Sequence, residues 1–280
     1  MNTVTSHVLA PDTCVVRNTA ARKGRTRSVA PGTTPVRFLH YGRIVMDGGD
    51  APIEFSTGDM ETALIVLRGT AMVRVENQDY ALTRYDALYV PRETSVRVTP
   101  PAAGCDLAEI AAPVAARHSV KFVSFADAQK DPGLHIKPGG PAAKRDLTVL
   151  IGKNVQAGRL MAGVTFSDPG NWTSWPPHEH AAMLEEAYLY IDMPAPGFGV
   201  QLLYTNAREP EVATIVRESD IVVMPAGYHP NVAAPGHPIN FLWMMAAIRE
   251  NDDRQYGVVN VHPDFAATPS GLDAGRSDKR

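Results

Sequence analysis

The sequence predicts an all-β protein that consists of two antiparallel β-sandwich or barrel units with few short helices. Short apolar runs, separated by turn residues, fill most of the chain after residue 35. No amphipathic helical pattern separates these runs, as it would in a parallel α/β protein. The two halves also repeat each other weakly, and 280 residues are sufficient for two domains with their own cores.

The composition limits the classes of function that the chain can have. Hydrophobic residues make up 44% of the sequence and charged residues 20%, which is ordinary for a soluble globular protein. The net charge of -3 gives no reason to expect nucleic acid or an anionic membrane as a partner. No apolar run approaches the roughly 20 residues of a membrane helix. The two cysteines are too few for a disulfide framework, so we expect a reducing, cytoplasmic compartment.

Residues 1–34 are predicted to form a basic N-terminal arm. The arm is poor in acidic residues and lacks the apolar segment of a secretory signal. Its basic residues include Arg17, Arg22, Lys23, Arg25 and Arg27. We interpret it as a solvated arm, which could pack on a neighbouring subunit; a targeting peptide is the alternative.

Residues 35–112 are predicted to form the first β unit. Its expected strands are 36–46, 62–67, 71–75, 80–82, 87–91, 95–98 and 106–111. Turn residues at 48–50 and 77–79 separate some of these runs. Short strands with this spacing are typical of an antiparallel meander that closes into a sandwich or barrel.

A connector over residues 113–145 is predicted to lead into a second β unit over residues 146–265. The connector is rich in Ala, Pro, Lys and Gly, with one short helical turn at 125–129. The expected strands of the second unit are 147–151, 159–166, 187–191, 199–204, 221–225 and 239–245. The tail over residues 266–280 is small, polar and charged, and we expect it to be disordered.

A weak internal repeat relates the two units. The matched segments are 61–66 with 186–191, and 86–91 with 220–225. The first copy has no histidine where the second has His178 and His180. We therefore expect a metal only in the second unit, and a structural role for the first.

The most informative stretch is 171–180, which ends in a His-Xaa-His motif. His178 and His180 are two residues apart, so on an extended backbone they point to the same side. Pro176 and Pro177 stiffen the approach to this motif. A third imidazole is available far downstream at His229. Without further pattern, the two histidines could equally be a surface pair in a polar loop.

A carboxylate five or six residues after the motif can complete a metal site. Glu185 and Glu186 are the two candidates. Three neutral imidazoles and one carboxylate suit a divalent transition metal, with zinc as the first choice and Mn, Fe, Co or Ni as alternatives. On a regular strand the two glutamates point to opposite faces, so only one of them can be the ligand.

The histidine pair, the nearby glutamate and a later histidine after a Pro-Xaa-Gly turn resemble the metal-binding signature of the cupin superfamily. Segments 171–180, 184–188 and 227–230 resemble, more narrowly, the uronate and inositol-derived sugar isomerases. That family joins 5-deoxy-glucuronate isomerase to 4-deoxy-5-hexosulose-uronate ketol-isomerase, and the resemblance is closer to the former branch. It extends through 197–201 and 244–249, whereas the N-terminal half resembles the family only in layout.

The resemblance implies a bicupin fold of two jelly-roll barrels and a metal held by His178, His180, Glu186 and His229. The family's ligand glutamate opens a strand before a small residue and a tyrosine, which favours Glu186 and leaves Glu185 as a catalytic neighbour. The spacing common in cupins favours Glu185 instead. Two departures, a short loop after His180 and Met-Ala-Ala at 245–247, leave the exact sugar open.

An aldose–ketose isomerase moves a proton between adjacent carbons, so it needs a Lewis acid and a base. Glu185 is the first candidate for the base, and a metal-bound hydroxide is the second. Arg249 is a candidate for binding a uronate carboxylate, with a surface salt bridge as the alternative. The candidates for binding sugar hydroxyls or forming the pocket wall are Trp175, Gln201, Tyr204 and Tyr228. For the aromatic residues, a place in the barrel core is the alternative.

The resemblance implies a metal-dependent isomerase of a small sugar acid, converting 5-deoxy-glucuronate to 2-deoxy-5-keto-gluconate in inositol catabolism. An isomerase of the same family with another sugar, an Fe(II) dioxygenase of the cupin superfamily and a sugar-sensing or storage protein are the alternatives. By analogy with cupin folds, which associate through exposed strand edges, we expect a homo-oligomer.

Overall fold

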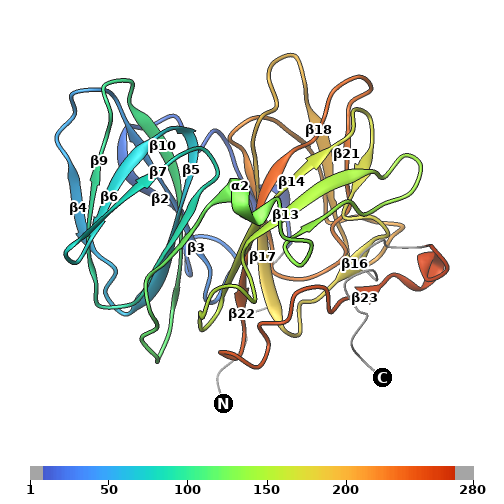
Figure 1. The fold of residues 1–280 in the computed structure, drawn as a ribbon. Helices are drawn as coiled ribbons and strands as arrows, with labels where there is room; N and C mark the ends of the chain where they lie inside the picture. The colour runs from blue at the N-terminus through green and yellow to red at the C-terminus, as the bar shows by residue number, and fades with distance from the viewer. Residues whose placement is uncertain (1–8, 269–280) are drawn as a thin grey trace.

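A computed structural model describes residues 9–268 and confirms the all-β prediction. Two barrels built from β-sheets lie side by side, the N-terminal one in blue and teal and the C-terminal one in green to red (Figure 1). Within residues 9–268 the helices are single turns: α1 (Pro11–Cys14), α2 (Phe125–Ala128) and a 3-10 turn at Pro263–Phe265. Residues 1–8 of the predicted arm and 269–280 of the predicted disordered tail lie outside the described residues.

The N-terminal barrel consists of a six-stranded and a four-stranded sheet. The larger sheet has the order β11-β8-β5-β10-β3-β2, and the smaller one β4-β9-β6-β7. The strand bounds are β2 (Gly24–Val29), β3 (His40–Met46), β4 (Ile53–Ser56), β5 (Met60–Gly69), β6 (Ala71–Val75), β7 (Gln78–Leu82), β8 (Ala87–Val90), β9 (Ser95–Thr99), β10 (Cys105–Pro113) and β11 (Lys121–Val123). The apolar faces of the two sheets enclose one core.

The C-terminal barrel repeats this architecture around a seven-stranded sheet of order β1-β20-β17-β22-β14-β13-β12. A four-stranded sheet, β15-β21-β18-β19, and a ribbon of β16 and β23 complete it. The bounds are β1 (Val15–Val16), β12 (His135–Ile136), β13 (Arg145–Ile151), β14 (Leu160–Ser167), β15 (Trp172–Thr173), β16 (His178–Glu179), β17 (Leu184–Tyr190), β18 (Gly199–Leu203), β19 (Val212–Val216), β20 (Ile221–Met224), β21 (Asn231–Ala233), β22 (Phe241–Ala247) and β23 (Asn260–Val261). All these strands pair antiparallel.

Two strands within residues 9–29, which belong to the predicted basic arm, pair with strands of the same chain. β1 adds to β20 of the C-terminal barrel, and β2 then adds to β3 of the N-terminal barrel. The arginines have acidic partners there, since Arg25 and Arg27 both bind the buried Glu109 and Arg17 binds Asp220. The cluster of basic residues predicted a solvated arm and did not indicate these acidic partners. The partners lie 82 to 203 residues away along the chain.

The two large sheets pack against each other and bury both faces of their central strands. One apolar cluster joins β3, β5, β8 and β10 of the first barrel to β14, β17, β20 and β22 of the second. On β17, Ala187 and Leu189 face this shared cluster, while Leu184, Tyr188 and Tyr190 face the interior of the C-terminal barrel. All of β17 is therefore buried, and alternation along the strand determines which side chains reach the barrel interior.

Two buried glutamates connect the barrels in a symmetric manner. Glu61, near the start of β5, accepts hydrogen bonds from the backbone N–H groups of residues 158–160 in the second half. Glu185, near the start of β17, accepts hydrogen bonds from those of residues 37–39 in the first half. Each carboxylate thus accepts hydrogen bonds from backbone N–H groups of the opposite barrel, which strand pairing does not satisfy.

This symmetry corrects the register of the internal repeat. The sequence alignment matched Glu61 with Glu186, but Glu61 corresponds to Glu185. In β5, Thr62 is paired with the last residue of β8, and in β17, Glu186 is paired with the last residue of β20. The first barrel therefore has Thr62 at the position of Glu186. The alignment was wrong by one residue because the second copy has two adjacent glutamates, Glu185 and Glu186, and Glu61 was matched with the second of them.

No helix within residues 9–268 has the length and apolar character to cross a membrane.

Candidate metal centre

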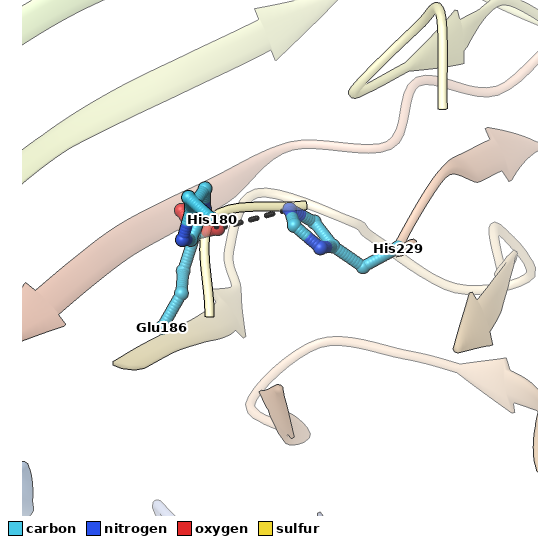
Figure 2. A group of neighbouring side chains, drawn as sticks. All are labelled: His180, Glu186 and His229. Carbon is cyan, nitrogen blue, oxygen red and sulfur yellow. Dashed lines mark hydrogen bonds and ion pairs between the residues drawn. The ribbon is translucent and has the colours of Figure 1, made fainter. Parts of the chain in front are cut away.

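Three buried side chains of the C-terminal barrel converge into one cluster, which we call the metal cluster: His180, Glu186 and His229. Each offers a ligand atom, and these atoms all lie within 4.8 Å of one another. His180 Nε2 lies 2.9 Å and His229 Nε2 lies 3.1 Å from Oε2 of Glu186. Figure 2 shows His229 approaching the other two side chains from a separate segment of the chain. Residues distant in the sequence therefore meet in a geometry that could hold a metal ion.

The barrel strands and one turn position this cluster. Glu186 lies near the start of β17 and His180 just after β16, and both face the interior. His229 follows a turn in which Gly227 has a φ of +90°. A β-carbon at Gly227 would lie 2.8 Å from the carbonyl oxygen of Tyr204, so this turn requires glycine for both reasons.

Backbone carbonyls orient the imidazole rings. Nδ1 of His178 lies 2.9 Å from the carbonyl oxygen of Pro176, and Nδ1 of His229 lies 2.9 Å from that of Gly227. His180 makes the corresponding, longer contact of 3.3 Å with Leu184. Because a carbonyl oxygen only accepts, Nδ1 carries the proton in each contact, and Nε2 is the atom left to bind a metal.

His178 lies beside the metal cluster and lines the same cavity. Its ring centroid is 5.0 Å from that of His229 and 6.3 Å from that of His180. Burial and the neighbouring imidazoles lower the pKa of His178 to about 3, so its ring stays neutral. A neutral imidazole in this place is suitable as a further ligand.

The electrostatics of the cluster fit a cation. Burial alone would raise the pKa of Glu186, but the imidazoles of His180 and His229 outweigh this and lower it. The carboxylate is therefore ionised, and His229 Nε2 is a buried nitrogen without a hydrogen-bond partner among the described residues. His229 Nε2 lies 3.1 Å from a carboxylate oxygen of Glu186, so the two atoms are close enough to act as ligands of one metal ion.

Two predicted catalytic residues lie away from this cluster. Glu185 is on the opposite face of β17, between the barrels, where three backbone N–H groups occupy its carboxylate. It is therefore no longer a candidate for the base. Arg249 has a side chain that is 71% exposed and bound to Asp253, and it does not line the cavity. Arg249 therefore forms a surface salt bridge, which was the alternative to binding a carboxylate of the substrate.

The other predicted substrate contacts also have different neighbours. Gln201 is fully buried, and its amide nitrogen donates to the carbonyl oxygens of His229 and Pro230, so it holds the segment that carries His229. Trp175 packs against Trp172 and Phe265. Tyr204 and Tyr228 pack against each other and His262. Among these four predicted residues, none lines the cavity at the metal cluster.

Sequence reasoning missed several residues that do line this cavity. Its polar residues include Arg145, Ser174, Tyr188 and Tyr256, and its apolar wall includes Leu147, Leu184, Phe241, Trp243 and Met245. Tyr188 lies within one of the matched segments, and its hydroxyl lies 2.7 Å from that of Ser174. Arg145 and Tyr256 lie outside every motif, so no local signal could have indicated them.

Comparison with known proteins identifies the family of this chain. A model of the KduI/IolB family matches residues 14–265. The 5-deoxy-glucuronate isomerase of Geobacillus kaustophilus is 27% identical over 241 residues, which cover 80% of this chain and 85% of that protein. The enzyme of the same name from Shouchella clausii is 26% identical and covers 80% and 91%, respectively.

Solved structures share the fold. An IolB-like protein from Salmonella typhimurium superposes with a TM-score of 0.79 at 21% identity, covering 90% of this chain and 98% of that one. A variant of oxalate decarboxylase from Bacillus subtilis superposes with a TM-score of 0.63 at 11% identity, covering 89% and 79%. The family model spans nine-tenths of the chain, and the resemblance that the histidine motif suggested is confirmed at this level: the chain belongs to the KduI/IolB family.

Proposed function

We propose that this chain is a metal-dependent sugar isomerase that converts 5-deoxy-glucuronate to 2-deoxy-5-keto-gluconate. The observation that supports this most strongly is the buried metal cluster, which opens on a cavity in a member of a family whose relatives include 5-deoxy-glucuronate isomerases. His178, His180, Glu186 and His229 would hold the metal. Zinc is the first candidate, because three imidazoles and one carboxylate with a position left open suit it.

The bound metal would act as a Lewis acid on the carbonyl and hydroxyl oxygens of the sugar. The residues around it would bind the sugar and exclude water. Burial raises the pKa of Tyr188 well above its usual value, so its hydroxyl stays protonated and can donate a hydrogen bond to a sugar oxygen. Leu147, Leu184 and Phe241 form an apolar wall, which would keep bulk water away from the sugar while the proton is transferred between its carbons.

The test is isomerisation of 5-deoxy-glucuronate in deuterated water, followed by NMR. We expect a ketose product and exchange of the C2 proton of the substrate with solvent, without oxygen or nicotinamide. A chelator should abolish both signals, and added metal should restore them. Conversion that depends on oxygen, or no exchange at C2 with intact and metal-loaded protein, would contradict the proposal.

We also propose that the chain acts in inositol catabolism in the cytoplasm. We further propose that it forms a homo-oligomer. The pathway follows from the proposed substrate, and the oligomer from the sheet edges of the two barrels. Sedimentation analysis of the purified chain tests the oligomer directly. A monomer at micromolar concentration would remove this part of the proposal and leave the reaction untouched.

A further inference from the structure

A buried arginine in the cavity lacks an acidic partner. Arg145, the first residue of β13, is 5% exposed and lines the same cavity as the metal cluster. Its guanidinium donates to two backbone carbonyl oxygens, that of Ala143 at 3.1 Å and that of Trp175 at 3.3 Å. Within residues 9–268 no carboxylate forms an ion pair with it. Of its five N–H donors, two are thus used by carbonyl groups.

Another arginine of this chain shows how such a charge is usually accommodated. Arg43 is as deeply buried, at 1% exposure, and its fork binds both carboxylate oxygens of Asp106 at 2.7 and 2.8 Å. Arg145 has no such partner, and burial lowers the pKa of its guanidinium. A buried cation without an ion-pair partner is unfavourable, so the space beside Arg145 favours an anion.

A second unsatisfied donor lines the same cavity. The side chain of Trp243 is 2% exposed, and its Nε1–H has no hydrogen-bond partner among the described residues. Its indole is held by stacking on Tyr256, with ring centroids 5.1 Å apart and an interplanar angle of 22°. The Trp243 Nε1–H without an acceptor and the N–H groups of Arg145 that no carbonyl uses together indicate a ligand with acceptor oxygens.

We propose that Arg145 is the residue that binds the carboxylate of the substrate, with Trp243 as an additional donor. This inference rests on the proposed function, in which the substrate is a sugar acid. A planar guanidinium fits a carboxylate in a bidentate manner, which a neutral sugar cannot match. Arg145 thereby selects uronates over neutral aldoses, the role that the sequence suggested for Arg249.

The experiment compares two substrates in four variants. The substrates are 5-deoxy-glucuronate and the neutral aldose that carries a hydroxymethyl group in place of its carboxylate. The variants are Arg145→Gln, Arg145→Lys, Trp243→Phe and, as a matched control on the surface, Arg249→Gln. Metal content and thermal unfolding of each variant are measured first, so that loss of the fold is distinguished from loss of a contact.

For Arg145→Gln we expect kcat/KM on the uronate to fall about 100-fold or more, mainly through KM. On the neutral aldose, kcat/KM should stay within about threefold of wild type, because an amide still accommodates a hydroxyl group. Arg145→Lys should recover part of the loss, since an ammonium supplies the charge without the fork. Arg249→Gln should equal wild type. Equal losses on both substrates, or no loss on the uronate, would overturn the inference.

A binding measurement separates this inference from the proposed function. Glucuronate should raise the unfolding temperature of wild type and Arg249→Gln, but not that of Arg145→Gln. If wild type does not isomerise 5-deoxy-glucuronate but this pattern holds, the proposed reaction is wrong and the carboxylate site stands. If wild type is active and glucuronate stabilises Arg145→Gln equally, the carboxylate site is wrong. Should Arg145→Gln not fold, Arg145→Lys and Trp243→Phe carry the same comparison with smaller expected losses.

Discussion

At the scale of single residues, the structure gives two adjacent glutamates different partners. Glu186 faces the imidazoles of the metal cluster, whereas Glu185 faces backbone N–H groups of the other barrel. Both side chains are almost fully buried, at 1% and 2% exposure, so burial does not distinguish them. The hydrogen-bond partners do distinguish them, so substituting each glutamate in turn gives a matched pair of variants.

Glu186→Gln should abolish metal binding, and Glu185→Gln should preserve it. In Glu186→Gln the metal loses its only anionic ligand, so we expect well below one-tenth of the metal content of wild type. In Glu185→Gln the interface loses a charge that accepts three backbone hydrogen bonds, and the free energy of unfolding should fall by about 2–4 kcal/mol. Metal analysis and chemical denaturation of both variants check this. The reverse pattern would make Glu185 the ligand.

Metal binding should release a proton near neutral pH. Burial lowers the pKa of His180, but Glu186 outweighs this effect and raises the pKa above its usual value. The metal requires the neutral ring, so protons compete with it, and metal affinity should rise as pH rises through the pKa of His180. Calorimetric titration of the metal-free protein in two buffers with different ionisation enthalpies counts the protons. Uptake of protons, or affinity that falls from pH 6 to pH 8, would contradict this arrangement.

The sequence predicted the histidines of the metal cluster and narrowed its carboxylate to two candidates, but it did not predict the whole cavity. The resemblance to the cupin signature, a histidine pair followed by a glutamate and a later histidine after a turn, brought His180 and His229 into one hypothesis. The choice between Glu185 and Glu186 depends on which face of β17 is the barrel interior, and strand pairing determines that. Arg145 was at the end of a predicted connector, and only its place on β13 brings its side chain into the cavity.

At the scale of elements, the loop that carries His229 depends on a buried amide. Gln201, on β18, donates to the carbonyl oxygens of His229 and Pro230 and accepts from Asn231. It therefore holds the segment that carries His229, and it does not line the cavity at the metal cluster. The prediction of a strand at 199–204 is correct, but the sequence does not show that the amide of Gln201 bonds the neighbouring strand and lies outside the cavity.

Gln201→Leu should weaken metal binding by about 10–100-fold, the usual effect of removing a group that orients a ligand. The leucine keeps most of the volume, so the barrel should still fold. Competition with a fluorescent zinc chelator measures the affinity. Gln78→Leu on the exposed strand β7 is the control, and it should bind metal like wild type. Unchanged affinity in Gln201→Leu would show that the turn holds His229 without this amide.

At the scale of the whole molecule, the two barrels form one structural unit. They share an apolar cluster between their large sheets, and the carboxylates of Glu61 and Glu185 cross from each barrel to the other. The first barrel has Thr62 at the position of Glu186, and the prediction that this barrel has a structural role stays a prediction. The two-barrel layout was predictable from repeated short strands, whereas this packing was not, because alternation looks the same whether the outer face meets water or another sheet.

Ile65→Ala, in the N-terminal barrel, should therefore destabilise the entire chain. Ile65 is fully buried in the shared cluster, so its truncation should lower the free energy of unfolding by about 2–5 kcal/mol. Unfolding should remain a single transition when followed by both tryptophan fluorescence and circular dichroism. Met72→Ala, at an exposed position of the same barrel, should change stability little. Two separate transitions would show that the barrels fold independently.

The central claim is that imidazoles and Glu186 hold a metal on which a sugar acid is isomerised. Its most direct test is to measure the metal content and the 5-deoxy-glucuronate isomerase activity of the same purified samples, before and after stepwise removal by a chelator. We expect about one transition-metal ion per chain and activity in proportion to the metal that remains. Full activity in a sample without any transition metal would contradict the claim.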